Sequence, residues 1–128
     1  MQKLIIRWLP AVLLMAAIFV FSSIPSDELP DFAWADRLVK KGGHALGYGL
    51  LALSYARGLR SKSRPEPAPG RRRRYLVAFL LAVLYSALDE FHQSFTPGRH
   101  PSPWDVLIDS GGAALALLWA DRFLPGTS

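Results

Sequence analysis

Apolar residues gather in four runs along the chain, and polar segments separate these runs. The runs cover residues 4–21, 42–59, 75–88 and 106–124. The first holds 18 residues, which at a rise of ~1.5 Å per residue nearly crosses the ~30 Å hydrocarbon core of a bilayer. The third is shorter and spans only if its helix continues through Asp89 to about Phe95. The pattern therefore predicts transmembrane helices at about residues 4–22, 42–59, 75–95 and 103–122.

The runs lack the polar stripe that helices of a soluble bundle show. Residues 11–21 and 77–84 are apolar on every helical face, which is typical of helices in lipid. For the first run, the alternative is a signal peptide with Lys3 and Arg7 as its basic start. However, the "FSSIPS" that follows is a poor cleavage site, and further apolar runs come after it. We therefore expect an all-α integral membrane four-helix bundle, a single domain over residues 1–128.

Composition excludes some kinds of chemistry, and the distribution of charge predicts how the bundle is oriented in the membrane. The chain is 51% hydrophobic, and it has no cysteine, which excludes disulfides and thiolate chemistry. The net charge is +5, and eleven of the 15 Lys and Arg residues lie near the termini or in residues 57–74. By the positive-inside rule, both termini are cytoplasmic, and residues 22–41 and 89–103 face outward. We expect the arginine run at 71–74 to contact anionic lipids rather than nucleic acid.

The first outer segment contains apolar residues among its charges. It reads "DELPDFAWADRLVKK" at residues 27–41 and includes Phe32, Trp34, Leu38 and Val39. These side chains predict a short helix that lies at the membrane interface.

Ionisable side chains concentrate between the third and fourth runs, in "LDEFHQSFTPGRHPSPWDVLIDSGG" at residues 88–112. If the third helix continues to about Phe95, helical spacing places four polar side chains on one of its faces. These are Tyr85, Asp89, His92 and Gln93. The predicted topology brings this face to the outer leaflet.

The second and fourth helices supply polar groups at the same level. Lys41, His44 and Tyr48 share one face of the second helix. Asp105 and Asp109 are one turn apart in the fourth helix. The sequence therefore predicts a polar site at the outer leaflet, built from segments that are distant in the chain.

The fourth helix begins with a capping pattern. Ser102 is the expected N-cap, Pro103 the first helical residue and Asp105 the acid of a capping box. Asp109 has no such role. It lies one turn deeper in the membrane, where an ionised aspartate is costly unless it is hydrated or paired with another group.

Small residues predict how the helices approach each other. Gly43 and Gly47 form a G-x-x-x-G motif in the second helix, Gly49 follows two residues later, and "SGGAALA" comes directly after Asp109 in the fourth. Such residues let helix backbones come close in lipid. We expect these two helices to pack together and to bring His44 near Asp105 or Asp109.

Two interpretations of the polar site are chemical. Nitrogen and oxygen ligands suit a divalent cation. The candidate ligands are His44, Asp89, Glu90, His92, Asp105 and Asp109. No HExxH-like motif supports this reading, so no metal or cofactor is predicted. The other is general acid–base catalysis, with His44 or His92 beside Asp89 or Glu90.

Two further interpretations need no reaction. A lipid-linked or anionic headgroup would bind with Arg99 and Lys41 as anchors, since arginine suits bidentate contact with phosphate or carboxylate. Alternatively, the same two cations pair with the carboxylates in a salt-bridge network that holds the helices together. A network of that kind needs far fewer ionisable groups than the sequence supplies.

Several of these stretches resemble the VanZ-like family of small bacterial membrane proteins. They are "FSSIPS", "KKGGHALGYGLLAL", "LDEFHQSFTPGRHPSPWDVLID" and "SGGAALAL". The most specific part is D-E-x-x-Q, then P-G-R, then S-x-x-D, in this order and at close spacing. The resemblance covers nearly the whole chain.

The resemblance implies a multi-pass protein of the bacterial inner membrane. The founding member of the family is linked to resistance to glycopeptide antibiotics of the teicoplanin kind. Membrane lipids, and a lipid-linked envelope precursor or anionic headgroup, are the expected partners. The family positions are Lys41, His44, Tyr48, Asp89, Glu90, Gln93, Arg99, Ser102 and Asp105. Where the family often has asparagine, this chain has Asp109, which makes the site more anionic.

Overall fold

The computed structural model describes residues 1–25, 31, 33–60 and 65–124, and every regular element within them is helical. The elements are α1 (Gln2–Ser22), the 3-10 turn η2 (Ala33–Ala35), α2 (Asp36–Leu59), α3 (Ala68–Gln93) and α4 (Pro103–Phe123). The prediction of an all-α chain with four main helices is confirmed for the described residues.

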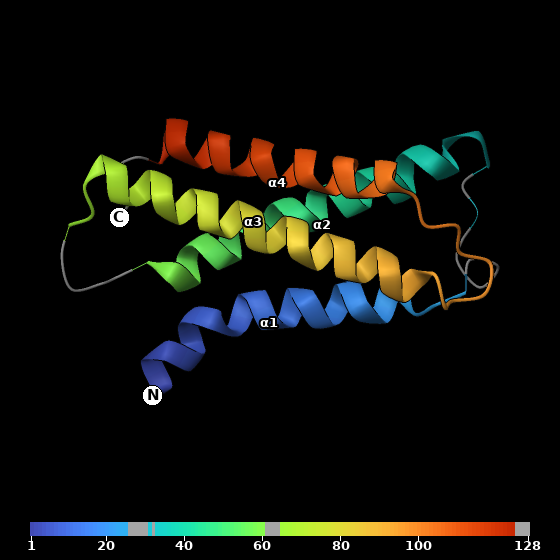
Figure 1. The fold of residues 1–128 in the computed structure, drawn as a ribbon, viewed down its shortest axis with the longest axis horizontal. Coiled ribbons are helices and arrows are strands. Elements are labelled where there is room, and N and C mark those ends of the chain that lie inside the picture. The colour runs from blue at the N-terminus through green and yellow to red at the C-terminus, as the bar shows by residue number, and fades with distance from the viewer. Residues whose placement is uncertain (26–30, 32, 61–64, 125–128) are drawn as a thin grey trace.

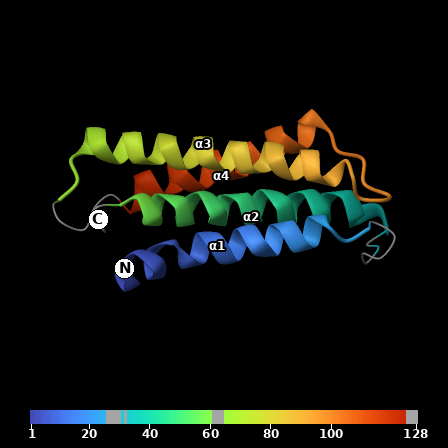
Figure 2. The same ribbon diagram turned by 60° about the horizontal axis from the view of Figure 1, so that its bottom comes forward.

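Successive helices run in opposite directions, so the start of α1 and the end of α4 lie at the same end of the bundle (Figures 1 and 2). α2 packs against α1, α3 and α4, whereas α1 and α4 do not contact each other within the described residues. We call the end that holds Arg57 and Arg71–Arg74 the basic end. The opposite end, which holds Lys41 and Asp89, is the site end.

Two helices begin earlier than the apolar runs predict. α2 begins at Asp36 rather than near residue 42, and α3 at Ala68 rather than near residue 75. Once a helix exists, each added residue gains a backbone hydrogen bond without a new nucleation step, and arginine is a good helix former. An ion pair of 2.9 Å between Arg74 and Glu66 fixes the start of α3.

α3 also ends earlier than predicted, at Gln93 rather than near Phe95. Turns follow the helix, and the N–H of Thr96 donates to the carbonyl oxygen of Gln93. Thr96 precedes Pro97, and a residue before proline disfavours the helical conformation. The polar face of α3 therefore extends only about one helical turn past the end of the apolar run.

The separate interfacial helix predicted for residues 27–41 is wrong where the structure describes that segment. Residues 36–41 form the first turns of α2, and only Ala33–Ala35 form a short element of their own. Residues 27–30 and Phe32 lie outside the described residues.

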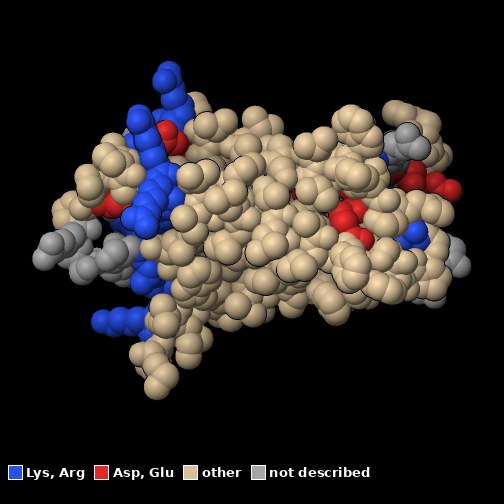
Figure 3. Space-filling model, viewed as in Figure 1, with Lys and Arg blue, Asp and Glu red and all other residues tan. Residues whose placement is uncertain are grey.

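Alanines make up most of the buried apolar residues, and many large apolar side chains face outward. The buried alanines are Ala11, Ala52, Ala56, Ala78, Ala82, Ala113 and Ala120. By contrast, Leu80 is 55% exposed and Leu115 is 70% exposed. On the face shown in Figure 3, an almost uncharged middle lies between the basic end and the site end. This distribution is typical of helices that pack together in lipid.

The closest helix approach is between α2 and α4. A Cβ atom at Gly112 would overlap the carbonyl oxygen of Ala45, and one at Gly49 would lie 3.1 Å from the carbonyl oxygen of Gly112. Glycine at these positions therefore lets the two backbones touch. The prediction that the second and fourth helices pack together is confirmed.

Gly112 of the "SGGAALA" stretch and Gly49 were both among the small residues predicted to bring these helices together, but the G-x-x-x-G pair takes no part in the contact. A Cβ atom at Gly43 or Gly47 would meet nothing within 4 Å, so the G-x-x-x-G motif is not the contact surface. The motif lies on the side of α2 that faces α1, whereas Ala45 and Gly49 face α4. At 3.6 residues per turn, Gly43 and Gly47 lie on a different face of α2 from Ala45 and Gly49. The motif alone does not show which of these faces meets α4.

Replacing Gly112 by alanine is expected to destabilise the bundle by about 1–3 kcal/mol, the usual cost of overpacking. The added methyl group has to displace the backbone of Ala45 rather than a flexible side chain. Reversible unfolding of the purified protein in detergent measures this difference. Gly111→Ala is the matched control because a Cβ atom there meets nothing within 4 Å. Equal stability of the two variants would contradict the contact.

Candidate functional site

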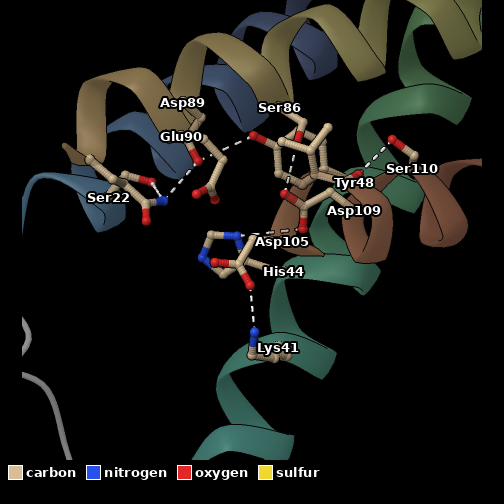
Figure 4. A network of polar contacts seen from close by, with 12 residues as sticks. Ser22, Lys41, His44, Tyr48, Ser86, Asp89, Glu90, Asp105, Asp109 and Ser110 are labelled. Carbon is tan, nitrogen blue, oxygen red and sulfur yellow. Dashed lines mark hydrogen bonds and ion pairs between the residues drawn. The ribbon is translucent and has the colours of Figure 1, made fainter. Parts of the chain in front are cut away.

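All four main helices contribute polar side chains to a network at the site end (Figure 4). We define this polar network as Ser22, Lys41, His44, Tyr48, Ser86, Asp89, Glu90, Gln93, Asp105 and Asp109. The antiparallel arrangement explains the gathering, because the end of α1, the start of α2, the end of α3 and the start of α4 lie together (Figure 1).

Asp89 links three helices and is only 4% exposed. Its Oδ2 accepts hydrogen bonds of 3.2 Å from Tyr48 Oη and from Gln93 Nε2. Gln93 Nε2 also donates to Ser22 Oγ at 3.2 Å, which ties α1 to α3. The Oδ1 atom of Asp89 is buried and has no hydrogen-bond partner within the described part of the chain. Such an atom is costly to bury, so a donor group that reached it would bind favourably.

Asp109 forms a second buried centre and is 1% exposed. Ser86 Oγ donates to its Oδ2 at 2.8 Å, and His44 Nδ1 lies 3.7 Å from its Oδ1. The His44 ring is further positioned by Phe21 on one side and Tyr48 on another. The prediction that the packing of α2 and α4 brings His44 near Asp109 is confirmed.

Lys41 and Asp105 form the outer rim of the network. Lys41 Nζ donates to Asp105 Oδ1 at 2.5 Å. The two side chains are 38% and 23% exposed, so solvent or lipid headgroups reach this pair more easily than they reach the two buried aspartates.

The start of α4 is capped by its own N-cap residue and by a side chain from α3. Ser102 Oγ accepts a hydrogen bond of 3.2 Å from the backbone N–H of Trp104, and Pro103 is the first helical residue. The predicted N-cap and the predicted first helical residue are therefore both confirmed. The capping-box role of Asp105 is wrong, because its carboxylate pairs with Lys41. The N–H of Ser102 donates instead to Glu90 Oε2 at 3.1 Å. A glutamate on α3 therefore fixes the first turn of α4.

Arg99 contacts the end of α1 and forms no ion pair with a carboxylate in the described part of the chain. Its Nε donates to the carbonyl oxygen of Ile24 at 3.1 Å, and its Nη2 to that of Phe21 at 2.9 Å. Helix carboxyl ends carry partial negative charge, so a guanidinium stabilises them. Burial lowers the pKa of Arg99 from its ordinary value, and the carboxylates of Asp89 and Glu90 oppose that shift. Of the two alternatives given for Arg99, pairing with the carboxylates is therefore wrong, and contact with an anionic headgroup stays a prediction.

His92 also contacts α1 rather than the carboxylates. Its Nε2 lies 2.9 Å from Ser23 Oγ, and its ring stacks on Phe19 with a centroid distance of 4.5 Å. The predicted acid–base pairing of His92 with Asp89 or Glu90 is therefore not formed. His44 is the histidine that the structure joins to a carboxylate.

A polar cavity of about 270 Å³ opens beside the network. Its lining consists of Lys40, Lys41, His44, Arg99, His100, Asp105, Ile108 and Asp109. The cavity therefore presents cationic donors and carboxylate acceptors at once. In the described residues, no three His, Asp or Glu side chains are grouped so that they would hold a metal ion. The divalent-cation interpretation gains no support from this geometry.

Two network residues were not predicted from the sequence. Ser86 is a hydroxyl within the apolar third run, one turn before Asp89 and Glu90. Ser22 lies in "FSSIPS" just after the first apolar run. A hydroxyl at helical spacing from a carboxylate is the signal for Ser86, whereas only the tertiary structure brings Ser22 to Gln93.

Fold and site together define a small all-α bundle with a buried polar network at one end and apolar outer faces. The chain belongs to the VanZ/LLP1 family, whose model matches residues 7–124. The resemblance stated from the motifs is thereby confirmed over nearly the whole chain. Comparisons with curated proteins and with solved structures gave no match.

Replacing Glu90 by alanine is expected to loosen the first turn of α4, because the N–H of Ser102 loses its acceptor. We expect amide hydrogen exchange at Ser102 to become about 10- to 100-fold faster, since hydrogen bonds to charged groups typically contribute about 1.5–3 kcal/mol. Exchange measured by NMR in detergent tests this. Glu90→Gln is the control, because its amide oxygen still accepts the bond. Unchanged exchange in Glu90→Ala would refute the cap.

Proposed function

We propose that this chain is a multi-pass envelope protein of the bacterial inner membrane. Its family supports this placement. By length and composition, α1 and α3 are candidate membrane spans among the described helices. α2 and α4 are not among these candidates, and charged residues lie along both of them, such as Lys41 and Asp109. Their exposed leucines, including Leu46 and Leu118, support their spanning as parts of the same bundle.

In this proposal the basic end faces the cytoplasm and the site end faces outward. In the sequence, eleven of the 15 Lys and Arg residues lie near the termini or in residues 57–74, and the positive-inside rule places these segments in the cytoplasm. Figure 3 shows the lysines and arginines gathered at that end. Both termini are then cytoplasmic.

Single cysteines test this orientation, and the native chain has none to interfere. In intact cells, we expect a membrane-impermeant maleimide to label His100→Cys at the site end. Arg73→Cys at the basic end should react only after the membrane is permeabilised. Both positions are exposed in the structure. The reverse labelling pattern would contradict the orientation.

The ligand in this proposal is an anionic or lipid-linked headgroup of the cell envelope. The observation that carries it is the polar cavity that opens onto the buried network. Lys41 and Arg99 supply charged donors at the lining, and Asp105 and Asp109 supply acceptors. A purely structural network does not need a cavity that is lined by charged donors and acceptors. Binding of such a headgroup accounts for the cavity.

The second candidate is an enzyme that acts on such a component by acid–base catalysis. It is favoured by the His44–Asp109 pair, in which Ser86 holds the carboxylate and the imidazole lines the cavity. A histidine next to an oriented carboxylate is a common general base. Turnover distinguishes the two candidates, since an enzyme converts its substrate repeatedly and a binding protein only saturates.

Alanine at Glu90, Gln93 or Arg99 is expected to abolish function while the protein still inserts into the membrane. From the family resemblance, we propose teicoplanin tolerance as the readout. Expression of the wild type should raise the minimal inhibitory concentration, and each variant should return it to the empty-vector value.

The matched control is Asp121→Ala, which removes a charged side chain at the basic end, where Asp121 pairs with Arg71. It should behave as the wild type does. Protein amounts in the membrane fraction exclude a loss of insertion. If the three site variants were as active as the wild type, the site proposal would fail.

A further inference from the structure

An apolar groove of about 520 Å³ runs between α1 and α2. Its lining consists of Leu14, Ala17, Ile18, Phe21, Val39, Lys40, Gly43, His44, Gly47 and Tyr48. The α1 wall is apolar and consists mainly of large side chains, and on the α2 wall Gly43 and Gly47 leave space between larger residues. The groove therefore has the shape and apolarity that suit a hydrocarbon chain.

The two glycines have no packing role that the structure shows. A Cβ atom at Gly43 or Gly47 would meet nothing within 4 Å. Glycine inside a helix costs about 1 kcal/mol relative to alanine. At Gly112, close contact with Ala45 offsets that cost, but no such contact exists here. Keeping the groove wide is a role that accounts for both glycines.

The groove meets the polar cavity at one point. Lys40 and His44 line both spaces. The only ion pair found for Lys40 in the described part of the chain is with Asp36, one helical turn away, at 2.9 Å. Such half-exposed i, i+4 pairs contribute little, so Lys40 exchanges this partner for another anion at small cost.

From the groove across that junction into the cavity, the lining changes from apolar to charged. A phospholipid changes in the same order, from its hydrocarbon chain to its headgroup. The groove accepts hydrocarbon. Next, Lys40 and Arg99 attract a phosphate, and the carboxylates of Asp105 and Asp109 accept hydrogen bonds from hydroxyl groups. A headgroup with phosphate and hydroxyls matches both signs of charge in the cavity.

We propose that the chain binds one phospholipid with a hydroxyl-bearing headgroup, whose hydrocarbon chain lies in the α1–α2 groove and whose headgroup fills the polar cavity. The inference rests on the proposed function, because it uses the same polar cavity, and it adds the ligand class and the second half of the site. The groove lies on a lateral face of the bundle, so the lipid enters from the bilayer.

Native mass spectrometry of the full chain in detergent, titrated with phosphatidylglycerol, tests this proposal. We expect one bound lipid per chain and weaker binding of phosphatidylcholine, whose headgroup has no hydroxyl donor. Gly47→Leu fills the groove without meeting a neighbour at its Cβ. Because each buried CH2 group changes binding roughly fourfold, loss of two or more contacts should raise the Kd by about tenfold or more.

Gly42→Leu is the matched control, since it makes the same change on the same helix, meets nothing at its Cβ and does not line the groove. It should bind as the wild type does. A second variant, Lys40→Gln, tests the headgroup half and should also raise the Kd. Circular dichroism verifies that the variants are folded.

The outcomes separate the two proposals. If Gly47→Leu binds the lipid as tightly as Gly42→Leu while Lys40→Gln binds weakly, the groove proposal is overturned and headgroup binding stands. Wild-type binding of chainless glycerol 3-phosphate as tight as that of phosphatidylglycerol would likewise overturn it. If the wild type binds neither compound, the groove proposal and headgroup binding by this cavity both fail.

Discussion

The contact between Gly112 and the carbonyl oxygen of Ala45 determines the geometry of the site. Ala45 is the residue after His44, and Gly112 lies one turn after Asp109. Because no side chain separates the two backbones, the imidazole of His44 reaches the carboxylate of Asp109 across the helix interface. A bulkier residue at the contact would move α2 away from α4. It would also widen the polar cavity that these helices line.

The buried carboxylates set the second constraint, because a charge away from water needs donors supplied by the protein. Those donors come from different helices: Tyr48 from α2 for Asp89, and Ser86 from α3 for Asp109. Lys41 and Arg99, the obvious cations, lie at the rim and at the end of α1. The interior of the network is therefore satisfied mainly by neutral donors, which leaves the cations at the edge of the network.

Apolar and polar surfaces are arranged so that one ligand would meet both. The outer faces of the helices are apolar, the site end is polar, and the groove between α1 and α2 joins these two environments at Lys40 and His44. In a soluble enzyme, a polar cavity receives its ligand from water. In the proposal made above, the groove between α1 and α2 would give a lipid a route from the bilayer, as suits an envelope protein of the VanZ/LLP1 family.

The number of helices and the turn of each helix that carries polar groups could be predicted from the sequence. Both follow from hydrophobic runs and from local spacing, which act within one helix. The family of the chain could be recognised from its motifs. The partners of the polar groups could not be predicted in this way: Glu90 rather than Asp105 accepts the N–H of Ser102, Arg99 contacts the end of α1, and Gly43 faces a groove. Spacing along one helix shows which residues share a face, but the partner of that face depends on how far each helix is rotated against its neighbours. That rotation is set by contacts such as Gly112 against Ala45, which join positions far apart in the chain.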